Sequence, residues 1–148
     1  EENGFAFNLK DAMTLNAQLS DELYELEQWS LKTFEPTIIE LKTKTKEIPF
    51  NIASRQQIGQ RLMDRGWKPT VRTEKDHVVV NEAVLKTITE PELIPLAKKF
   101  IRYFLIQKRS VMISSWINAC RDDGRVHGKV MTLRTVTGRM AHHSPNMA

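Results

Sequence analysis

The chain has 148 residues, of which 41% are hydrophobic, and its formal net charge at pH 7 is +4. This length and composition suit about one globular domain with its own core. No run of 18 apolar residues occurs, and the chain opens on Glu1 and Glu2, so we expect neither a transmembrane helix nor a signal peptide. The single Cys120 cannot form an internal disulfide, so we expect a packed, reduced thiol.

The charge is distributed unevenly along the chain. Residues 1–40 contain nine acidic and two basic residues, whereas residues 41–148 contain twenty basic and nine acidic residues. Such a basic segment is the electrostatic footprint of a protein that binds a phosphate backbone. A solvated, lysine-rich surface explains the same charge equally well.

A long amphipathic helix is predicted over residues 9–33. Asn8 is suited to the N-cap, Asp11 favours the positive end of the helix, and Pro36 follows its end. Apolar side chains recur at steps of three and four residues, at Ala12, Leu15, Leu19, Leu23, Leu26 and Trp29 or Ser30.

Residues 34–50 show no helical stripe and are predicted to form a connector. This segment mixes β-branched residues, prolines and the lysines Lys42, Lys44 and Lys46. These lysines are suited to phosphate contacts, but solubility of a flexible link explains them more simply.

Two shorter helices are predicted next. The first begins at Ser54, whose spacing to Gln57 makes a capping box, and it ends near Gly66. The second covers residues 81–88, with Asn81 as its cap.

A second long helix is predicted over residues 92–120, with Thr89 and Glu92 as a capping pair and the nearby prolines in its first turn. It is long enough to pair antiparallel with the first helix. Its predicted buried stripe consists of Leu93, Ala97, Phe100, Phe104, Val111 and Ser115 or Trp116.

Near the C-terminus, a turn at Asp122 to Gly124 precedes a predicted strand over residues 125–130 and a second over residues 135–140. The predicted fold class is therefore mainly α (α+β). It consists of a long antiparallel helical hairpin with a small helical insertion, plus a β-hairpin near the C-terminus.

The most specific motif is T-x-T-G-R at residues 135–139, followed by S-P-N at residues 144–146. With the preceding D-G-R-V-H-G at 123–128, it resembles the start of the palm in family A (Pol I-type) DNA polymerases, most closely the bacteriophage branch. The resemblance covers nearly the whole chain. Further similar segments are G-F-A-F-N at 4–8, F-N-I-A-S-R-Q-Q-I-G at 50–59, G-W-K-P-T at 66–70, I-Q-K-R at 106–109 and S-W at 115–116.

The resemblance implies a division into a palm edge segment at residues 1–7, a thumb at 8–120 and the start of the palm at 121–148. In that family the two carboxylates that hold the catalytic metal ions, and the helix that grips the incoming triphosphate, lie beyond the S-P-N turn. We therefore expect no catalytic residue and no metal ligand in this chain. It is expected to be a fragment of a longer polymerase, whose Mg²⁺ and deoxynucleoside triphosphates bind elsewhere in the intact enzyme.

The partners implied are primer–template DNA and the remainder of the polymerase polypeptide, in the cytoplasm of a bacterial host cell. In some phage relatives, a long insertion between the thumb helices recruits a host processivity protein. Residues 34–50 leave room for only a short link, so no such partner is expected.

Arg139 is the first candidate for DNA contact, because the resemblance places it in the minor groove at the primer terminus. Minor-groove acceptors lie in similar positions in every Watson–Crick pair, so a cationic donor there tests pair geometry without reading sequence. Thr135 and Thr137 share one face of the predicted strand, where they bond phosphates, support Arg139 or simply reflect β-propensity. Asn146 either lies near the template–primer junction or serves only its turn.

On the second long helix, Lys98, Arg102 and Arg109 lie within roughly 40° of one another, and Lys108 with Arg109 matches the family's Q-K-R. This stripe is expected to follow a phosphate strand, although a solvated helix face has the same appearance. His127 either packs in its strand or touches DNA. His142 and His143 point in opposite directions on a strand, which disfavours zinc.

We therefore expect a thumb and palm-entry fragment of a DNA-directed DNA polymerase that grips duplex DNA and is inactive alone. The alternative is a stand-alone, non-enzymatic helical domain that binds nucleic acid or protein, including one part of a naturally split polymerase.

Overall fold

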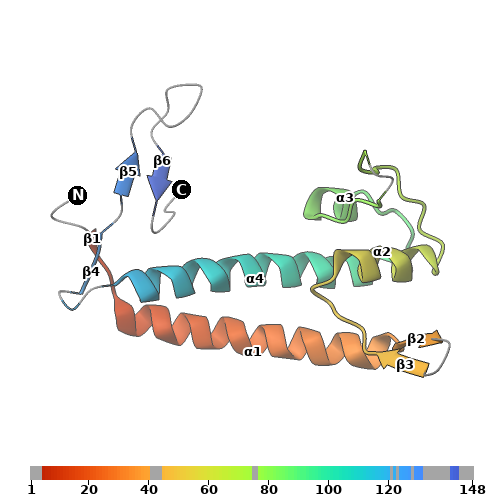
Figure 1. The fold of residues 1–148 in the computed structure, drawn as a ribbon, viewed down its shortest axis with the longest axis horizontal. Coiled ribbons are helices and arrows are strands. Elements are labelled where there is room, and N and C mark those ends of the chain that lie inside the picture. The colour runs from red at the N-terminus through yellow and green to blue at the C-terminus, as the bar shows by residue number, and fades with distance from the viewer. Residues whose placement is uncertain are drawn as a thin grey trace. The chain divides into compact units, whose positions relative to one another are not determined.

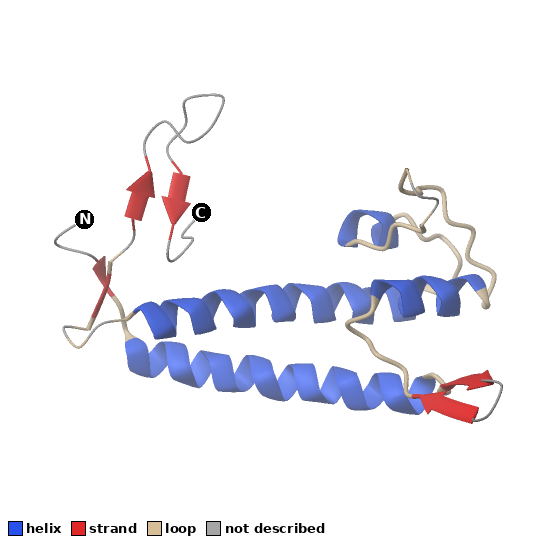
Figure 2. Ribbon diagram, in the orientation of Figure 1, coloured by secondary structure: helices blue, strands red, loops and turns tan. Residues whose placement is uncertain are grey.

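The computed structural model describes residues 5–40, 45–74, 77–120, 122, 124–127, 129–131 and 141–143. Helices dominate these residues, and the strands are short (Figure 2), which confirms the predicted mainly α, α+β class. No helix in these ranges is long and apolar enough to cross a membrane. The elements in Figure 1 are β1 (Phe5–Ala6), α1 (Leu9–Thr33), β2 (Thr37–Glu40), β3 (Thr45–Ile48), α2 (Arg55–Met63), α3 (Glu82–Lys86), α4 (Ile94–Ala119), β4 (Arg125–Val126), β5 (Lys129–Met131) and β6 (Ala141–His143).

The chain forms two compact units, one made of residues 1–21 with 107–148 and the other of residues 22–106. We call them the terminal unit and the central unit. The helices α1 and α4 contribute to both, and in each unit their segments lie side by side and antiparallel (Figure 1), as the predicted hairpin requires.

In the terminal unit, polar side chains join the two long helices. The Asn16 amide donates to Ser114 Oγ at 3.2 Å, and Ser110 Oγ donates to Asn16 Oδ1 at 3.0 Å. The predicted N-cap is confirmed, because Asn8 Oδ1 accepts from the Asp11 amide at 3.2 Å. Beyond the helices, β1 pairs antiparallel with β4, and β5 with β6.

The prediction of burial is wrong for two residues of the apolar stripes. Leu15 is 46% exposed and Val111 is 65% exposed. The face of α1 that meets α4 includes half-buried Asn16 instead of Leu15. This is possible because Ser110 and Ser114 form hydrogen bonds with the side-chain amide of Asn16. On α4, the contacts made by Ser110 and Ser114 turn the neighbouring Val111 toward solvent.

Aromatic rings form the core of the central unit. Phe34 lies 4.5 Å from Phe50 and 5.8 Å from Phe100, measured between ring centroids, and Trp29 packs edge-on against Phe34 and Phe100. Phe100 on α4 is completely buried. The core continues through α2 and α3 with Ile58, Leu62, Val84 and Leu85.

The signals that place α2 are confirmed at both ends. At its start, Ser54 Oγ accepts from the Gln57 amide, although the Gln57 side chain bonds the Asn51 amide at 2.7 Å rather than returning to Ser54. At its end, Gly66 has φ of +97°, and the amides of Gly66 and Trp67 bond the carbonyls of Met63 and Leu62. These two bonds make a Schellman motif, which favours glycine at the left-handed position.

The predicted cap of α3 is confirmed, whereas that of α4 is wrong. Asn81 Oδ1 accepts from the Val84 amide at 2.8 Å. The helix α4 begins at Ile94, and the amide of Thr89 bonds the carboxylate of Glu90 at 3.1 Å instead of that of Glu92. A turn precedes α4, in which the Glu90 carbonyl accepts from Leu93 and Ile94.

The connector predicted over residues 34–50 contains an antiparallel hairpin, with Thr37 paired to Ile48 and Glu40 to Thr45. Its threonines and isoleucines favour strands. The strand predicted over residues 125–130 is divided between β4 and β5. The strand predicted at 135–140 lies outside the described residues, and the partner of β5 is β6, at 141–143.

Candidate nucleic-acid interface

The DNA-binding residues predicted from the sequence fall into two groups. Lys98, Arg102, Lys108 and Arg109 lie on α4, and half-buried His127 follows β4. Thr135, Thr137, Arg139 and Asn146 lie outside the described residues.

Arg102 is engaged by a carboxylate of α1. Its Nε lies 2.6 Å from Glu22 Oε1, and its terminal nitrogen lies 2.9 Å from Glu22 Oε2. This bidentate pair is the strongest geometry available to a carboxylate and a guanidinium. The hydrogen bond from Arg102 lowers the pKa of Glu22, and the same bond raises the pKa of Arg102. Arg102 therefore joins α4 to α1 within the central unit.

Two neighbours of Arg102 also contact α1. The Lys99 ammonium lies 4.4 Å from the centre of the Trp29 ring, and the Tyr103 hydroxyl donates to Glu27 at 3.2 Å. Burial raises the pKa of Tyr103 to about 12, and the nearby negative charge of Glu27 adds to the shift. Residues 99, 102 and 103 thus hold the two helices together.

Arg61 of α2 and Arg65 of the turn after it have structural roles that the sequence did not predict. Arg61 donates to the Thr37 hydroxyl at 3.2 Å and to the Glu35 carbonyl. Arg65 donates to the Thr33 carbonyl at 3.4 Å, with its guanidinium 4.8 Å from the Phe34 ring centre. Both cations therefore lie at the C-terminal end of α1, where positive charge is stabilising. Only the tertiary packing brings them there, because 24 or more residues separate the partners.

Lys98, Lys108 and Arg109 remain exposed. None of them forms an ion pair with another side chain in the part of the chain that the structure describes. Lys98 borders a small apolar hollow with Ile94 and Ile101 in the central unit, whereas Lys108 and Arg109 belong to the terminal unit. Such cations are available to phosphate oxygens.

Metal-ligating residues do not gather in the described ranges, where no three His, Cys, Asp or Glu side chains are placed to hold an ion. Asp122 lies in the turn before Gly124. Gly124 has a φ of +70°, and its carbonyl accepts from the Phe7 amide at 3.1 Å. These features give this segment a structural role.

Residues 15–148 match the sequence profile of DNA polymerase family A. The DNA-directed DNA polymerases of Escherichia phage T7 and Enterobacteria phage T3 are each 34% identical to the chain over 112 residues. These alignments cover 72% of this chain but only 16% of each relative. A similar fold occurs in a solved complex of the POL domain of Pol1 from M. smegmatis with DNA primer-template and dNTP. It has 18% identity and a TM-score of 0.78, and the match covers 97% of this chain and 23% of that one.

Proposed function

The chain belongs to DNA polymerase family A, and on this basis we propose that it is the part of a DNA-directed DNA polymerase that grips the primer–template duplex. Its contribution is positioning. In such an enzyme the primer 3′-hydroxyl attacks the α-phosphate of a nucleotide, and a duplex held in line supplies the orientation that this step needs.

The observation that supports this role best is that some cations of α4 are engaged by side chains of α1, whereas others are exposed. Arg102 is occupied by Glu22, and Lys99 by Trp29. Lys98, Lys108 and Arg109 are exposed without a carboxylate partner among the described side chains. We propose that these three residues contact sugar–phosphate backbone, which holds a duplex without reading its sequence.

The other long helix is suited to a different neighbour. Glu25 and Glu35, on and just after α1, are exposed carboxylates that repel a phosphate strand. The uneven charge of the sequence therefore places acidic side chains on α1 and basic side chains on α4.

Catalytic metal chemistry is assigned to residues outside this chain. Among the described residues, no three His, Cys, Asp or Glu side chains lie together where they could hold an ion. We propose that the Mg²⁺ and the deoxynucleoside triphosphate are held by other parts of the intact enzyme, in the host cytoplasm, and that the chain alone does not extend a primer.

For Arg139, Thr135, Thr137 and Asn146 we propose contacts at the primer–template end, on the strength of the T-x-T-G-R and S-P-N motifs. For His127, in the D-G-R-V-H-G segment, we propose a contact with DNA. Arg139 would donate to minor-groove acceptors that all base pairs share.

The test is duplex binding by the 148-residue chain, measured by fluorescence anisotropy over a series of salt concentrations. We expect weak binding without sequence preference. The double variant Lys108→Ala/Arg109→Ala should bind more weakly, and its salt slope should fall by about 0.9 for each phosphate that it no longer neutralises.

The matched control is Lys10→Ala/Lys32→Ala, which removes the same charge from exposed positions of α1. If the control weakens binding as much as the α4 variant, net charge rather than α4 accounts for the affinity, and the proposed interface is wrong. Strong preference for one DNA sequence would also contradict it.

A further inference from the structure

An apolar groove with an acidic rim lies in the central unit, between the end of α1 and the segment that leads from β3 to α2. One hollow of about 300 Å³ is lined by Leu31, Phe34, Pro36, Glu47, Pro49 and Phe50. A second hollow, of about 400 Å³, shares Leu31, Pro49 and Phe50 with the first and adds Glu27, Ser30, Asn51 and Ile52. We call the two together the Leu31 groove.

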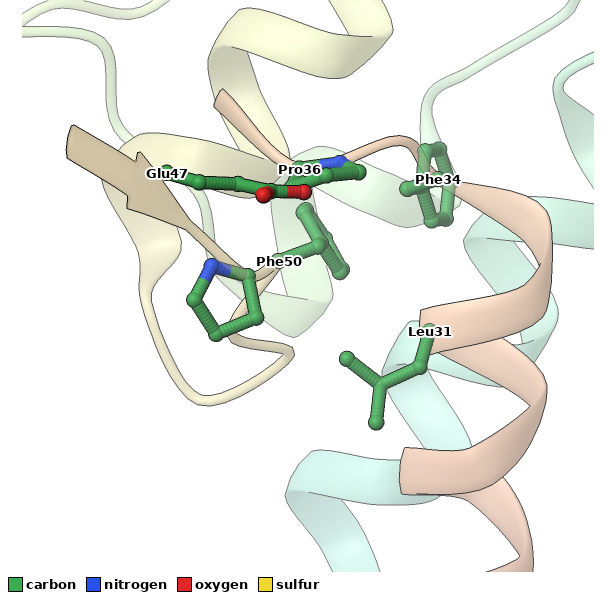
Figure 3. Close-up of a pocket in the computed structure, with 6 residues that line it drawn as sticks. Leu31, Phe34, Pro36, Glu47 and Phe50 are labelled. Atoms are coloured by element: carbon green, nitrogen blue, oxygen red, sulfur yellow. The ribbon is translucent and has the colours of Figure 1, made fainter. Parts of the chain in front are cut away.

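The groove has an apolar floor and an accessible wall. Phe34 and Phe50 are buried in the aromatic core, so their positions are set by packing. Leu31 is 46% exposed, so its side chain is accessible from solvent. Figure 3 shows the side chains of Leu31, Phe50 and Glu47 directed into the same hollow. A preformed, partly apolar depression of this kind takes a bulky side chain.

The charges around the groove select the occupant. Glu27 and Glu47 are the ionisable residues that line the two hollows, and both are acidic. The nearby cations Lys32, Lys46, Arg61 and Arg65 line neither hollow, and Arg61 and Arg65 donate to the carbonyls of Glu35 and Thr33. Exposed Glu35 follows α1 close by in sequence. A phosphate backbone is repelled by this rim, whereas a Lys or Arg side chain is attracted to it.

We propose that the Leu31 groove binds a basic segment of a partner protein, with a leucine or aromatic anchor over Phe50 and flanking cations at Glu27 and Glu47. This interaction is separate from the grip on DNA, because it uses acidic α1 and not the exposed cations of α4. It does not depend on the proposed polymerase function.

The experiment is an NMR titration of the ¹⁵N-labelled 148-residue chain with three synthetic peptides. The first is Gly-Lys-Lys-Leu-Trp-Arg-Lys-Gly. The second replaces all of its cations by glutamate, and the third replaces Leu-Trp by Ser-Gly. We expect the first peptide to shift the amide signals of Leu31, Phe34, Glu47 and Phe50, and the other two to bind at least about tenfold more weakly.

Variants connect this binding to the groove. Leu31→Ser removes the exposed wall and Glu47→Lys reverses the rim charge, so each should weaken the first peptide by about tenfold. Val71→Ser and Glu92→Lys are matched controls, since both residues are exposed and line neither hollow. They should leave the affinity unchanged, and circular dichroism melting checks that all four variants fold.

Several results would overturn the proposal. Equal affinity for the acidic and the basic peptide would do so, as would a Val71→Ser variant that weakens binding as much as Leu31→Ser. A duplex DNA titration that shifts the Leu31 and Phe50 signals more than the peptide does would assign the groove to nucleic acid. Shifts at these residues that grow with chain concentration alone would assign it to a second copy of the chain.

Discussion

The role of each cation on α4 depends on which side chain lies within its reach. Arg102 meets Glu22 in a bidentate pair, while Arg109, two turns further along, has no carboxylate partner among the described side chains. A paired guanidinium has less capacity to bind phosphate, because a phosphate oxygen must compete with the carboxylate. Arg102→Ala should therefore alter the helix pair more than the affinity for DNA.

The Glu22–Arg102 pair predicts a pH dependence of stability. The bond to Arg102 lowers the pKa of Glu22 below 4.5, so the folded chain takes up a proton less readily than the unfolded chain. The stabilisation is present above pH 4.5 and is lost as the pH falls through the lowered pKa. Glu22→Gln should lower the melting temperature slightly at pH 7, since both partners are partly exposed, and should cost nothing once the pH is below that pKa.

Thermal melting of both proteins between pH 7 and pH 2 measures this difference. Glu25→Gln is the control, because Glu25 is an exposed acid on the same helix without an ion pair among the described side chains. A difference between Glu22→Gln and the parent that persists unchanged at the acid end would rule out the pair as its cause.

Among the elements, α4 contributes the fully buried ring around which the aromatic core of the central unit packs. Phe100 is completely buried and contacts the rings of Trp29, Phe34 and Phe50. The same ring cluster therefore holds together α1, the segment after β3, and α4. On the stretch of α4 in the terminal unit, the polar bonds of Asn16 to Ser110 and Ser114 join it to α1.

Phe100→Ala should destabilise the chain by about 3–5 kcal/mol, because it removes a buried ring and leaves a cavity that rigid neighbours cannot fill. Val111→Ala, on the same helix, should change stability by less than about 0.5 kcal/mol, since Val111 is 65% exposed. Urea unfolding of the two variants measures both values. Equal destabilisation by the two substitutions would show that Val111 is buried after all.

For the whole protein, the chain's contribution must be measured in an intact polymerase, because it spans only 16% of the length of the phage relatives that it matches. A phosphate contact adds uniform binding energy, whereas a donor at the primer terminus acts when the chemistry is about to occur. The two kinds of residue should therefore have different kinetic effects.

Arg139→Ala in the intact enzyme should slow extension by roughly ten- to a hundredfold, the cost of one charged hydrogen bond of about 1.5–3 kcal/mol. It should also reduce discrimination against a mismatched primer end. Single-turnover incorporation at saturating DNA measures both effects. Arg109→Ala is the comparison, since it should raise the dissociation constant for DNA but leave this rate nearly normal. A parental rate and parental mismatch discrimination for Arg139→Ala would remove its proposed role.

The motifs along the chain were sufficient to indicate the family. Local sequence was sufficient to predict the helices and most of their caps, because these depend on neighbouring residues. Asn8, Ser54, Asn81 and Gly66 each act within a few positions of themselves. Tertiary packing decides instead which positions of the apolar helix stripes are buried and which cations pair with a carboxylate. Leu15 and Arg102 owe their surroundings to partners about 80 to 100 residues away, which periodicity does not register. The Leu31 groove likewise exists only where α1 meets the segment before α2.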